Sequence, residues 1–419
     1  MNILFLADNF PPERNAQASR VFERARFWVR WGHKVIVVTC APNFPEGKVY
    51  AGYQNRWRQF EELSGIRVIR VKTFITRNEG TVLRIQDDSS YMLPAFFAGA
   101  AERRPDLVAA TSPTLFAAVA GWALSVALHV PFVLELSDLW PASIAAVGAM
   151  RPNAILRWLE ALELFLYRRS AAIVAQTAAF QEDLIRRHIP ASKISVVTNG
   201  VDLDRFVPRE RDLELSAKCG LERGHFVAGY IGTQGMAHAL ENVLEAAHRV
   251  RGSNIRFLFV GTGAARESLI AEAARRNLTN VIFVPPQPKE MMPAFWSLCD
   301  AALVHLRNSP VMATVIPSKI FEAMAMGLPI VLASPEGEAS RVVSGEGAGV
   351  CVPAEDPAAL ANTVLLLSEN RALLERFSEC SREAAPRYSR ERQARDMLAV
   401  LEGVAQTEPR RSRSLRSFL

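Results

Sequence analysis

The sequence predicts an α/β protein with two Rossmann-like domains, each a doubly wound parallel sheet with helices on both faces. Short apolar runs alternate with amphipathic helical segments along the chain, which is the pattern of parallel sheets. A chain of 419 residues is longer than one hydrophobic core usually serves. The alternation restarts after the turn-forming run at 199–202, which therefore indicates a linker between two domains.

Strands are expected wherever a short apolar run lies between turn signals. The first half contains Asn2–Ala7, Lys34–Cys40, Ile66–Lys72, Asp106–Thr111, Phe132–Leu136, Ala172–Ala175 and Ile194–Val197. The second half contains Phe226–Ile231, Ile255–Val260, Val281–Val284, Ala301–His305, Ile330–Ala333 and Gly349–Val352. Residues 107–134 carry no Lys, Arg, Asp or Glu, but Pro113 and Pro131 bracket a helix too short to span a membrane. A buried strand–helix–strand unit is the better interpretation.

This pattern divides the chain into four segments. We expect domains at 1–198 and 199–386, a C-terminal helix at 387–405 and a basic tail at 406–419. The arginine-rich tail has the composition of a disordered segment. In doubly wound sheets, ligands bind beyond the carboxyl ends of the strands, so the loops after the strands carry the candidate functional residues.

Composition restricts the partners and the compartment. The net charge of +6 is mild for this length, so it permits an anionic partner, and no nucleic-acid partner is expected. The five cysteines are scattered singly without a C-x-x-C pair, which argues against zinc and against a disulfide framework. The chain enters a strand at once without a secretory signal, so we expect a reducing, cytoplasmic location.

The run at 317–329 has the features of a complete short helix. Pro317 suits the first helical position, and Gly327 followed by Pro329 ends the helix. The helix start then leaves backbone N–H groups unpaired where a phosphate binds well, those of Ser318, Lys319 and Ile320.

Side chains of the same run add to this chemistry. Ser318 supplies a hydroxyl and Lys319 a charge, and Glu322 lies one turn on, where its carboxylate can accept hydrogen bonds from sugar hydroxyls. Ile320, Phe321 and Met324 are expected to pack inward. An ordinary capped surface helix would show the same pattern, so the surrounding motifs decide between the two interpretations.

Other loops of the second half also follow predicted strands. The loop after 226–231 carries small or hydrogen-bonding residues that suit an anion, namely Gly232, Thr233, Gln234 and His238. Gly261 follows the next strand, and Pro286 and Gln287 lie in a rigid loop that can hold a nucleobase. The structural alternatives are a solvated side chain or a helix start for His238, a tight turn for Gly261, and a plain rigid connection for Pro286 and Gln287.

Two loops of the first half contain candidate acceptor residues. Arg14 and Arg20 suit an acceptor phosphate, with Asn15 between them, whereas 24–30 indicates a solvated basic face. Asp138 follows the strand at 132–136, where its carboxylate faces a ligand or caps the next turn. The D-x-D pattern at 202–204 lies in the linker, which favours a turn and cap over a metal site.

Taken together, these motifs resemble those of glycosyltransferase family 4, whose members have the GT-B fold. More narrowly, the chain resembles the bacterial branch that makes O-antigen, capsule and exopolysaccharide, including fucosamine-transferase-like and colanic-acid-type enzymes. The resemblance covers nearly the whole chain. It rests on the order of Phe10-Pro11-Pro12-Glu13, Trp31-Gly32-His33-Lys34-Val35, Asp138-Leu139-Trp140-Pro141, Asn199-Gly200-Val201-Asp202 and the run from Pro317 to Pro329.

The resemblance implies a nucleotide-sugar donor, by analogy a UDP-sugar, in the second domain and a lipid-linked or saccharide acceptor in the first. It implies a retaining transfer with no metal or other cofactor, and a final helix that crosses back to the first domain. It places Ser318 and Lys319 at the diphosphate and Glu322 on the ribose, and Asp138 becomes an acceptor-side candidate. Lys319, Glu322 and Asp138 are therefore the candidate catalytic residues.

The chain also departs from the family pattern. Thr314 stands where many members carry the first of two glutamates, and Thr233, Gln234 and His238 replace an Arg and a Lys. Asn15-Ala16 replaces a glycine pair. The missing groups leave open a catalytically inactive donor-binding partner. Because fold does not determine function, a nucleotide-sugar 2-epimerase on the same fold is a second alternative.

Contact with an anionic membrane surface is a further hypothesis. The tail arginines and the helix from Ala154 to Arg169, with Trp158, Phe165 and Tyr167, suggest peripheral docking at the inner face of the cell membrane. A core helix and a solvated tail form the alternative.

Overall fold

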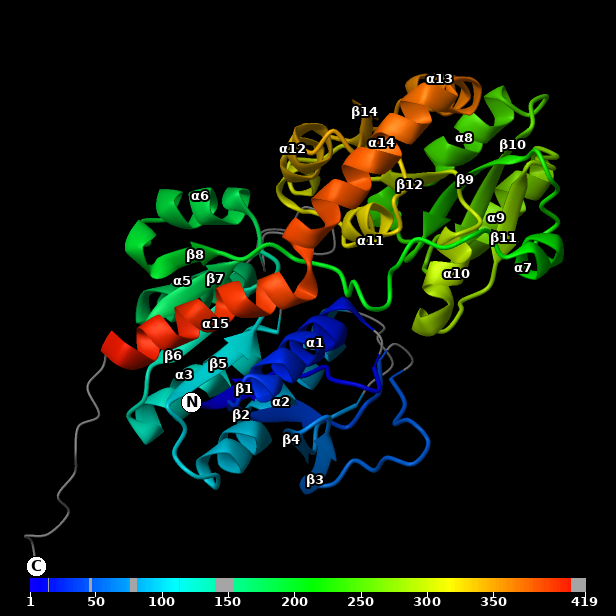
Figure 1. Ribbon diagram of the computed structural model, residues 1–419. Coiled ribbons are helices and arrows are strands. Elements are labelled where there is room, and N and C mark those ends of the chain that lie inside the picture. The colour runs from blue at the N-terminus through cyan, green and yellow to red at the C-terminus, as the bar shows by residue number, and fades with distance from the viewer. Residues whose placement is uncertain (14, 45–46, 76–80, 113, 140–153, 408–419) are drawn as a thin grey trace, which may run out of the picture. The chain divides into compact units, whose positions relative to one another are not determined.

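Figure 1 shows the computed structural model, which describes residues 1–13, 15–44, 47–75, 81–112, 114–139 and 154–407. The chain forms two compact units. The first contains Met1–Gln176, Phe180–Val197 and the chain from Gln393 onward, and the second contains Thr177–Ala179 and Thr198–Arg392. The chain thus enters the second unit beside residue 198, where the sequence analysis places the boundary, and returns at 392–393 instead of 386.

The two connecting passages run beside each other in the second unit. The Val201 N–H donates to the Tyr388 carbonyl at 2.9 Å, and the Arg390 N–H donates to the Val201 carbonyl at 2.7 Å. A Cβ on Gly200 would lie 2.5 Å from the Tyr388 carbonyl oxygen, so this close approach requires glycine. The Arg390 guanidinium donates to Asn199 Oδ1 at 2.6 Å. The expected linker at 199–202 is therefore fastened to the start of the last helix.

The first unit is built on one twisted sheet with the order β3-β4-β2-β1-β5-β6-β7-β8 among the described residues. Its strands are β1 Asn2–Leu6, β2 Lys34–Cys40, β3 Arg58–Leu63, β4 Ile66–Val71, β5 Leu107–Thr111, β6 Phe132–Leu136, β7 Ala172–Ala175 and β8 Ile194–Val196. All neighbours pair in parallel except β3 and β4, which are antiparallel. The sequence analysis did not predict β3 and expected parallel pairing throughout, so this edge is a correction. β3 reads RQFEEL, and a polar edge strand gives no apolar run.

Helices cover both faces of this sheet. They are α1 Ala16–Arg30, α2 Thr81–Ala100, α3 Leu115–Leu128, α5 Ala154–Arg169, α6 Ala178–Arg186, the 3₁₀ turn η1 Ala191–Lys193, and α15 Arg390–Thr407. From Gln393, α15 packs with α1, and Trp28 of α1 donates its indole N–H to the Ala394 carbonyl at 2.9 Å. Met397 and Leu401 of α15 share one core cluster with Phe5 of β1. The last helix therefore returns to the first unit, as the resemblance implied.

The second unit contains a parallel sheet with the order β11-β10-β9-β12-β13-β14 among the described residues. Its strands are β9 Phe226–Ile231, β10 Ile255–Val260, β11 Val281–Val284, β12 Ala301–His305, β13 Ile330–Ser334 and β14 Gly349–Pro353. Every strand predicted for either half is present, with ends within one residue of the prediction. Because the strand order runs outward in both directions from β9, the topological switch point lies between β9 and β12, where ligands bind in such sheets.

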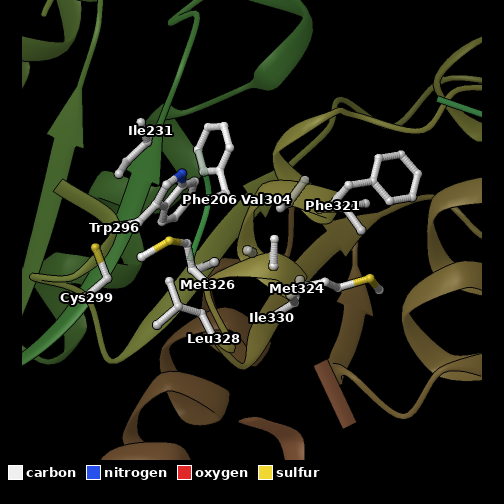
Figure 2. Close-up of a cluster of buried hydrophobic side chains, with 14 of the residues drawn as sticks. Phe206, Ile231, Trp296, Cys299, Val304, Phe321, Met324, Met326, Leu328 and Ile330 are labelled. Atoms are coloured by element: carbon white, nitrogen blue, oxygen red, sulfur yellow. The ribbon is translucent and has the colours of Figure 1, made fainter. Parts of the chain in front are cut away.

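Two apolar layers hold this sheet between helices. The helical elements are α7 Leu213–Lys218, η2 Met236–His238, α8 Glu241–Arg249, α9 Arg266–Arg275, η3 Lys289–Met291, α10 Met292–Trp296, η4 Met312–Thr314, α11 Lys319–Ala325, α12 Glu338–Gly345, α13 Pro357–Glu369, α14 Arg371–Ala384 and η5 Ala385–Tyr388. One layer joins β9 and β10 to α8 and α13. The other joins the opposite face to α10 and α11, and Figure 2 shows its buried side chains around Trp296 and Met324.

Candidate functional site

The loops after β9 and β10 lie against each other at the carboxyl edge of the second sheet. The Gly232 N–H donates to the Val260 carbonyl at 2.9 Å, and the Gln234 N–H donates to the Thr262 carbonyl at 2.8 Å. A Cβ on Gly261 would lie 2.3 Å from the Gly232 carbonyl oxygen. The glycine at 261 is therefore required by the packing of two loops, the alternative that the sequence analysis left open.

The start of α11 differs from its prediction in two respects. α11 begins at Lys319 with Ser318 as the preceding cap, so Pro317 lies before the helix and not at its first position. The Ile320 N–H donates to the Pro317 carbonyl at 3.1 Å and is therefore not available to a phosphate. A tight turn at Pro317 uses this donor inside the chain. The inward packing is confirmed, because Ile320 and Phe321 are fully buried.

Lys319 connects α11 to the end of β9. The residue is buried, with only 9 % of its surface exposed. Its Nζ lies 3.5 Å from the centroid of the Tyr230 ring, and a Cβ on Gly232 would lie 3.2 Å from that nitrogen. Within the described part of the chain, this ammonium has no hydrogen-bond partner. Burial lowers the pKa of Lys319 to about 7, although the Glu322 carboxylate acts in the opposite direction.

Gln234 is a second buried polar group without a partner. Its side chain is fully buried, and neither Oε1 nor Nε2 has a hydrogen-bond partner among the described residues. A buried amide in this state costs about 1–3 kcal/mol of stability unless a ligand or water satisfies it. Lys319 and Gln234 thus leave a cation and an amide uncompensated at one edge of the sheet.

His238 and His305 lock the loop after β9 to the end of β12. His238 Nδ1 lies 3.3 Å from the His305 carbonyl oxygen, and His305 Nδ1 lies 2.7 Å from that of His238. Because carbonyl oxygens only accept, both Nδ1 atoms carry the proton. Burial, with the Lys319 charge, lowers the pKa of His238 to about 4, so the ring is neutral near pH 7. Sequence reasoning missed His305, although it ends a predicted strand.

Glu322 is held by a tryptophan from another element. Trp296 of α10 donates its indole N–H to Glu322 Oε2 at 3.2 Å. Glu322 is half-buried on α11, one turn from Ser318, which is also half-buried. Thr314, at the position of the missing family glutamate, donates its hydroxyl to the Val311 carbonyl at 2.8 Å.

The remaining donor candidates line the same edge less deeply. Thr233 is exposed, and its carbonyl accepts the Tyr230 hydroxyl at 2.7 Å. Pro286 is exposed, and Gln287 donates its amide to the Pro285 carbonyl at 3.3 Å. The donor candidates therefore differ in burial, because Lys319 and Gln234 are buried whereas Thr233 and Pro286 are exposed.

In the first unit, Arg20 has a different role from the predicted one. Its Nε lies 2.9 Å from Glu135 Oε1, and Arg24 Nη2 lies 2.7 Å from Glu135 Oε2. Burial alone would raise the pKa of Glu135, but Arg24 and Arg20 outweigh it and lower that pKa to about 2. Arg20 and Arg24 are 4 % and 1 % exposed. Arg20 is thus committed to Glu135 and not to an acceptor phosphate, and Arg24 does not lie on a solvated face.

The other acceptor candidates have structural partners or fall outside the described residues. Asn15 caps α1, because its Oδ1 accepts the Ala18 N–H at 2.8 Å and its Nδ2 donates to Asn9 Oδ1 at 2.7 Å. Arg14 lies outside the described residues. Asp138 lines a cavity in the first unit together with Glu163 of α5.

Asp202 confirms the turn interpretation of the D-x-D pattern. Its Oδ1 accepts the Asp204 N–H at 3.1 Å, and its carbonyl accepts the Phe206 N–H at 2.9 Å. Across the described ranges, no group of three or more His, Cys, Asp or Glu side chains is arranged to hold a metal ion.

Two models of known protein families match this chain. The model described as Glycosyltransferase Family 4 matches residues 17–205, and that described as Glycosyl transferases group 1 matches residues 213–384. The chain belongs to glycosyltransferase family 4. This glycosyltransferase is 26 % identical to WcaI of Escherichia coli K12, assigned to colanic acid biosynthesis, over 90 % of this chain and 96 % of WcaI. It is 26 % identical to TuaH of Bacillus subtilis 168, assigned to teichuronic acid biosynthesis, over 48 % and 49 % of the two chains.

Solved structures show the same GT-B fold. Sucrose-phosphate synthase from Thermosynechococcus elongatus superposes with a TM-score of 0.78 at 19 % identity, covering 97 % of this chain and 100 % of the other. HepE of Anabaena in complex with UDP-glucose has a TM-score of 0.72 at 19 % identity, with 96 % and 100 % coverage. Among the described helices of the glycosyltransferase, none combines the length and apolarity that a membrane span requires.

Proposed function

We propose that this glycosyltransferase transfers a sugar from a UDP-sugar to a lipid-linked (polyprenyl) or saccharide acceptor during synthesis of a bacterial surface polysaccharide. The observation that carries the proposal is the Lys319 ammonium, buried against the Gly232 turn without a hydrogen-bond partner. A diphosphate is the partner that such a cation lacks. The assignments of WcaI and TuaH support the polysaccharide role, and the UDP and UDP-glucose complexes of HepE support the nucleotide.

Charge separation explains what these residues do. As the glycosidic bond breaks, negative charge grows on the departing diphosphate. Lys319 and Gln234 are buried at this edge and Ser318 precedes α11, so we expect the ammonium, the amide and the hydroxyl to stabilise this charge more than they stabilise the bound substrate. The Glu322 carboxylate accepts hydrogen bonds from the ribose. These groups require no metal at the diphosphate.

We further propose that the anomeric configuration is retained. The acceptor hydroxyl attacks from the face that the diphosphate leaves, and a departing phosphate oxygen takes the hydroxyl proton. The bond to the acceptor forms as the bond to the diphosphate breaks, so no separate strong base is needed. Asp138 is then an acceptor contact, and its loss should raise KM for the acceptor more than KM for the donor.

A lipid-linked acceptor would bring the enzyme to a membrane surface. On α5, Trp158 is 57 % exposed and suits a membrane interface, as does the exposed Arg157 beside it. Two residues of the predicted docking face are corrected: Tyr167 is buried, and Phe165 packs edge-on against Trp122 at 4.8 Å. We therefore expect Trp158→Ala to reduce sedimentation with anionic liposomes at low salt. Equal sedimentation of this variant and the unsubstituted enzyme would argue against docking through α5.

The direct test of function combines binding with transfer. A thermal-shift screen of UDP, GDP, ADP and CMP should raise Tm for UDP, since ligand at 100 times its Kd adds about 2.7 kcal/mol of stability. Lys319→Met should abolish the shift, whereas Lys218→Met, at an exposed surface pair, should keep it. If none of the nucleotides raised Tm, the donor site would be refuted. Release of an epimerised sugar without acceptor would instead identify an epimerase.

A further inference from the structure

The outer edge of β3 (Arg58–Leu63) is not paired within the chain. Among the described strands, β3 pairs only with β4, and Figure 1 shows it at the end of the first unit's sheet. In the part of the chain that the structure describes, no backbone–backbone hydrogen bond outside this hairpin involves residues 58–63. An open edge of this kind can accept a strand from another chain.

The turn of the hairpin determines which backbone groups of β3 lie at the open edge. The two turn residues, 64 and 65, have φ values of 54° and 79°, positive at both positions as in a type I′ turn. The pair next to such a two-residue turn, Leu63 and Ile66, exchanges hydrogen bonds, and the direction of these groups alternates along a strand. Three residues of β3 therefore direct their N–H and C=O groups to the open edge: Arg58, Phe60 and Glu62.

The side chains of this edge are incompletely covered. Phe60 is 54 % exposed, and Trp57, just before β3, is 72 % exposed. The guanidinium groups of Arg58 and Arg67 lie 4.6 and 4.8 Å from the centroid of the Phe60 ring. Both guanidinium groups share one carboxylate, that of Glu102, at 2.6 and 3.1 Å. Two cations on one anion leave a positive charge, which a second carboxylate would neutralise.

A second copy of the same strand supplies that carboxylate. In an antiparallel pair of β3 strands centred on Phe60, the open backbone groups of the two copies face each other. The opposed side chains are then Arg58 with Glu62, Gln59 with Glu61, Phe60 with Phe60, and Trp57 with Leu63. These are pairs of opposite charge, of amide with carboxylate, and of two apolar groups, and each kind stabilises a sheet.

Neighbouring registers are less complementary. A slip that centres the pair on Glu61 places two carboxylates opposite each other. A slip that centres it on Gln59 places the apolar Trp57 opposite Glu61. Because like charges directly opposite each other are unfavourable, the sequence of β3 selects the register centred on Phe60.

We propose that the β3 edge is the interface through which two copies of this glycosyltransferase form a dimer with two-fold symmetry and one continuous sheet. The second copy is a better occupant than an anionic lipid surface, since β3 itself carries two carboxylates and one guanidinium group. The inference does not depend on the donor site, because all of these residues lie in the first unit and the donor candidates lie in the second.

Charge reversal at either end of β3 tests this pairing. Arg58→Glu places two carboxylates opposite each other on both sides of the axis, and Glu62→Arg places two guanidinium groups there. Each variant alone should raise the Kd of the dimer by at least about tenfold, as sedimentation velocity over a concentration series would measure. A one-to-one mixture of the two variants should restore dimers, because every opposed charged pair again has opposite signs.

Glu214→Arg is the matched control for Glu62→Arg. It makes the same change of charge at an exposed glutamate of the second unit, so it should sediment like the unsubstituted enzyme. Dimers in the mixture would support the interface, and they cannot result from misfolding of either variant. A monomeric unsubstituted enzyme, or a dimer that survives both charge reversals, would overturn the inference and leave the donor site unaffected.

Amide hydrogen exchange of the unsubstituted enzyme gives a second test that does not require a folded variant. The peptide that covers residues 58–63 should exchange more slowly above the Kd of the dimer than below it, because pairing protects its outward N–H groups. Equal exchange rates at both concentrations would overturn the inference. If Phe60→Lys abolished sedimentation with anionic liposomes and the enzyme were monomeric, the occupant of this edge would be a membrane and not a second copy.

Discussion

The two units bury cations in opposite ways. In the first unit, Arg20 and Arg24 of α1 enclose Glu135 of β6, at 2.9 and 2.7 Å. In the second unit, Lys319 lies over the Tyr230 ring with no hydrogen-bond partner among the described residues. Burying a charge is costly unless a counter-charge compensates for it. A buried cation with a counter-charge thus stabilises the fold, whereas a buried cation without one indicates where the negative charge of a ligand binds.

Removing the counter-charge of the first unit should give the largest effect. Glu135→Ala leaves two buried guanidinium groups facing each other, so we expect a loss of about 3–5 kcal/mol in the free energy of unfolding. Urea denaturation followed by circular dichroism measures this loss. Glu214→Ala, which breaks an exposed pair with Lys218, should change stability little. Equal midpoints for the two variants would contradict the structural role of the Glu135 cluster.

Removing the cation of the second unit should have opposite effects on stability and activity. Lys319→Met keeps an unbranched side chain, one atom shorter, and removes a buried amine, so the protein should be as stable as before or more stable. Transfer should fall by roughly 10²–10³-fold in kcat/KM, the effect of losing one preorganised group that stabilises developing charge. If Lys319→Met destabilised the protein and left transfer unchanged, Lys319 would belong with the arginines of the first unit.

The pH dependence of stability tests the same contrast. The folded-state pKa of Lys319, about 7, lies below its usual value of 10.5, so the unfolded chain binds more protons between these two values. Stability contributed by this residue therefore rises with pH from about 7 to 10.5. The stabilising effect of Lys319→Met should be largest at or below pH 7 and should fade toward pH 10. An effect independent of pH would show that Lys319 is not buried as a cation.

Donor binding should have the reverse pH dependence. A diphosphate favours the charged amine, so the affinity for UDP-glucose should be constant below pH 7 and should fall above it, by at most about tenfold per pH unit. UDP-glucose is the suitable probe because its pyrophosphate diester does not titrate in this range. Lys319→Arg should remove the pH dependence, since a guanidinium stays charged. Calorimetry between pH 6 and 9 measures both proteins, and parallel profiles would exclude Lys319 as the titrating group.

The contrast between the units also explains which parts could be predicted from the sequence. Parallel strands are buried on both faces and appear as continuous apolar runs, so β1 and β9 were predicted to within a residue, whereas the polar edge strand β3 was not. The spacing of Arg20 and Arg24 on a helix looks the same whether the helix faces water or core. Their partner, Glu135, lies 111 residues beyond Arg24, and only tertiary structure joins them. The sequence contains one signal for this ion pair, because Glu135 is a charged residue inside an otherwise apolar strand.

The candidate site was predictable in position but not in detail for the same reason. Topology places the loop at 232–238 and the start of α11 at one sheet edge, which the sequence pattern predicts. Contacts between elements determine the rest. No local pattern indicates that Gly261 is glycine because of the Gly232 carbonyl, or that Trp296 reaches Glu322.

Substitution of Gln234 should have a smaller effect on stability and donor binding than the substitutions above. Its amide is neutral, fully buried and unpartnered, so it resembles Lys319 without the charge. Gln234→Leu replaces it with an apolar side chain of similar volume and should leave stability unchanged or raise it, because the unpartnered amide at this position is removed. Affinity for UDP should fall by about threefold to tenfold, the range for one neutral hydrogen bond, and should do so equally at pH 6 and pH 9. Thermal denaturation and calorimetry give both quantities on one sample. If Gln234→Leu lowered stability and left UDP affinity unchanged, Gln234 would be a structural residue. Lys319 would then be the one of these two unpartnered residues that remains a candidate for donor binding.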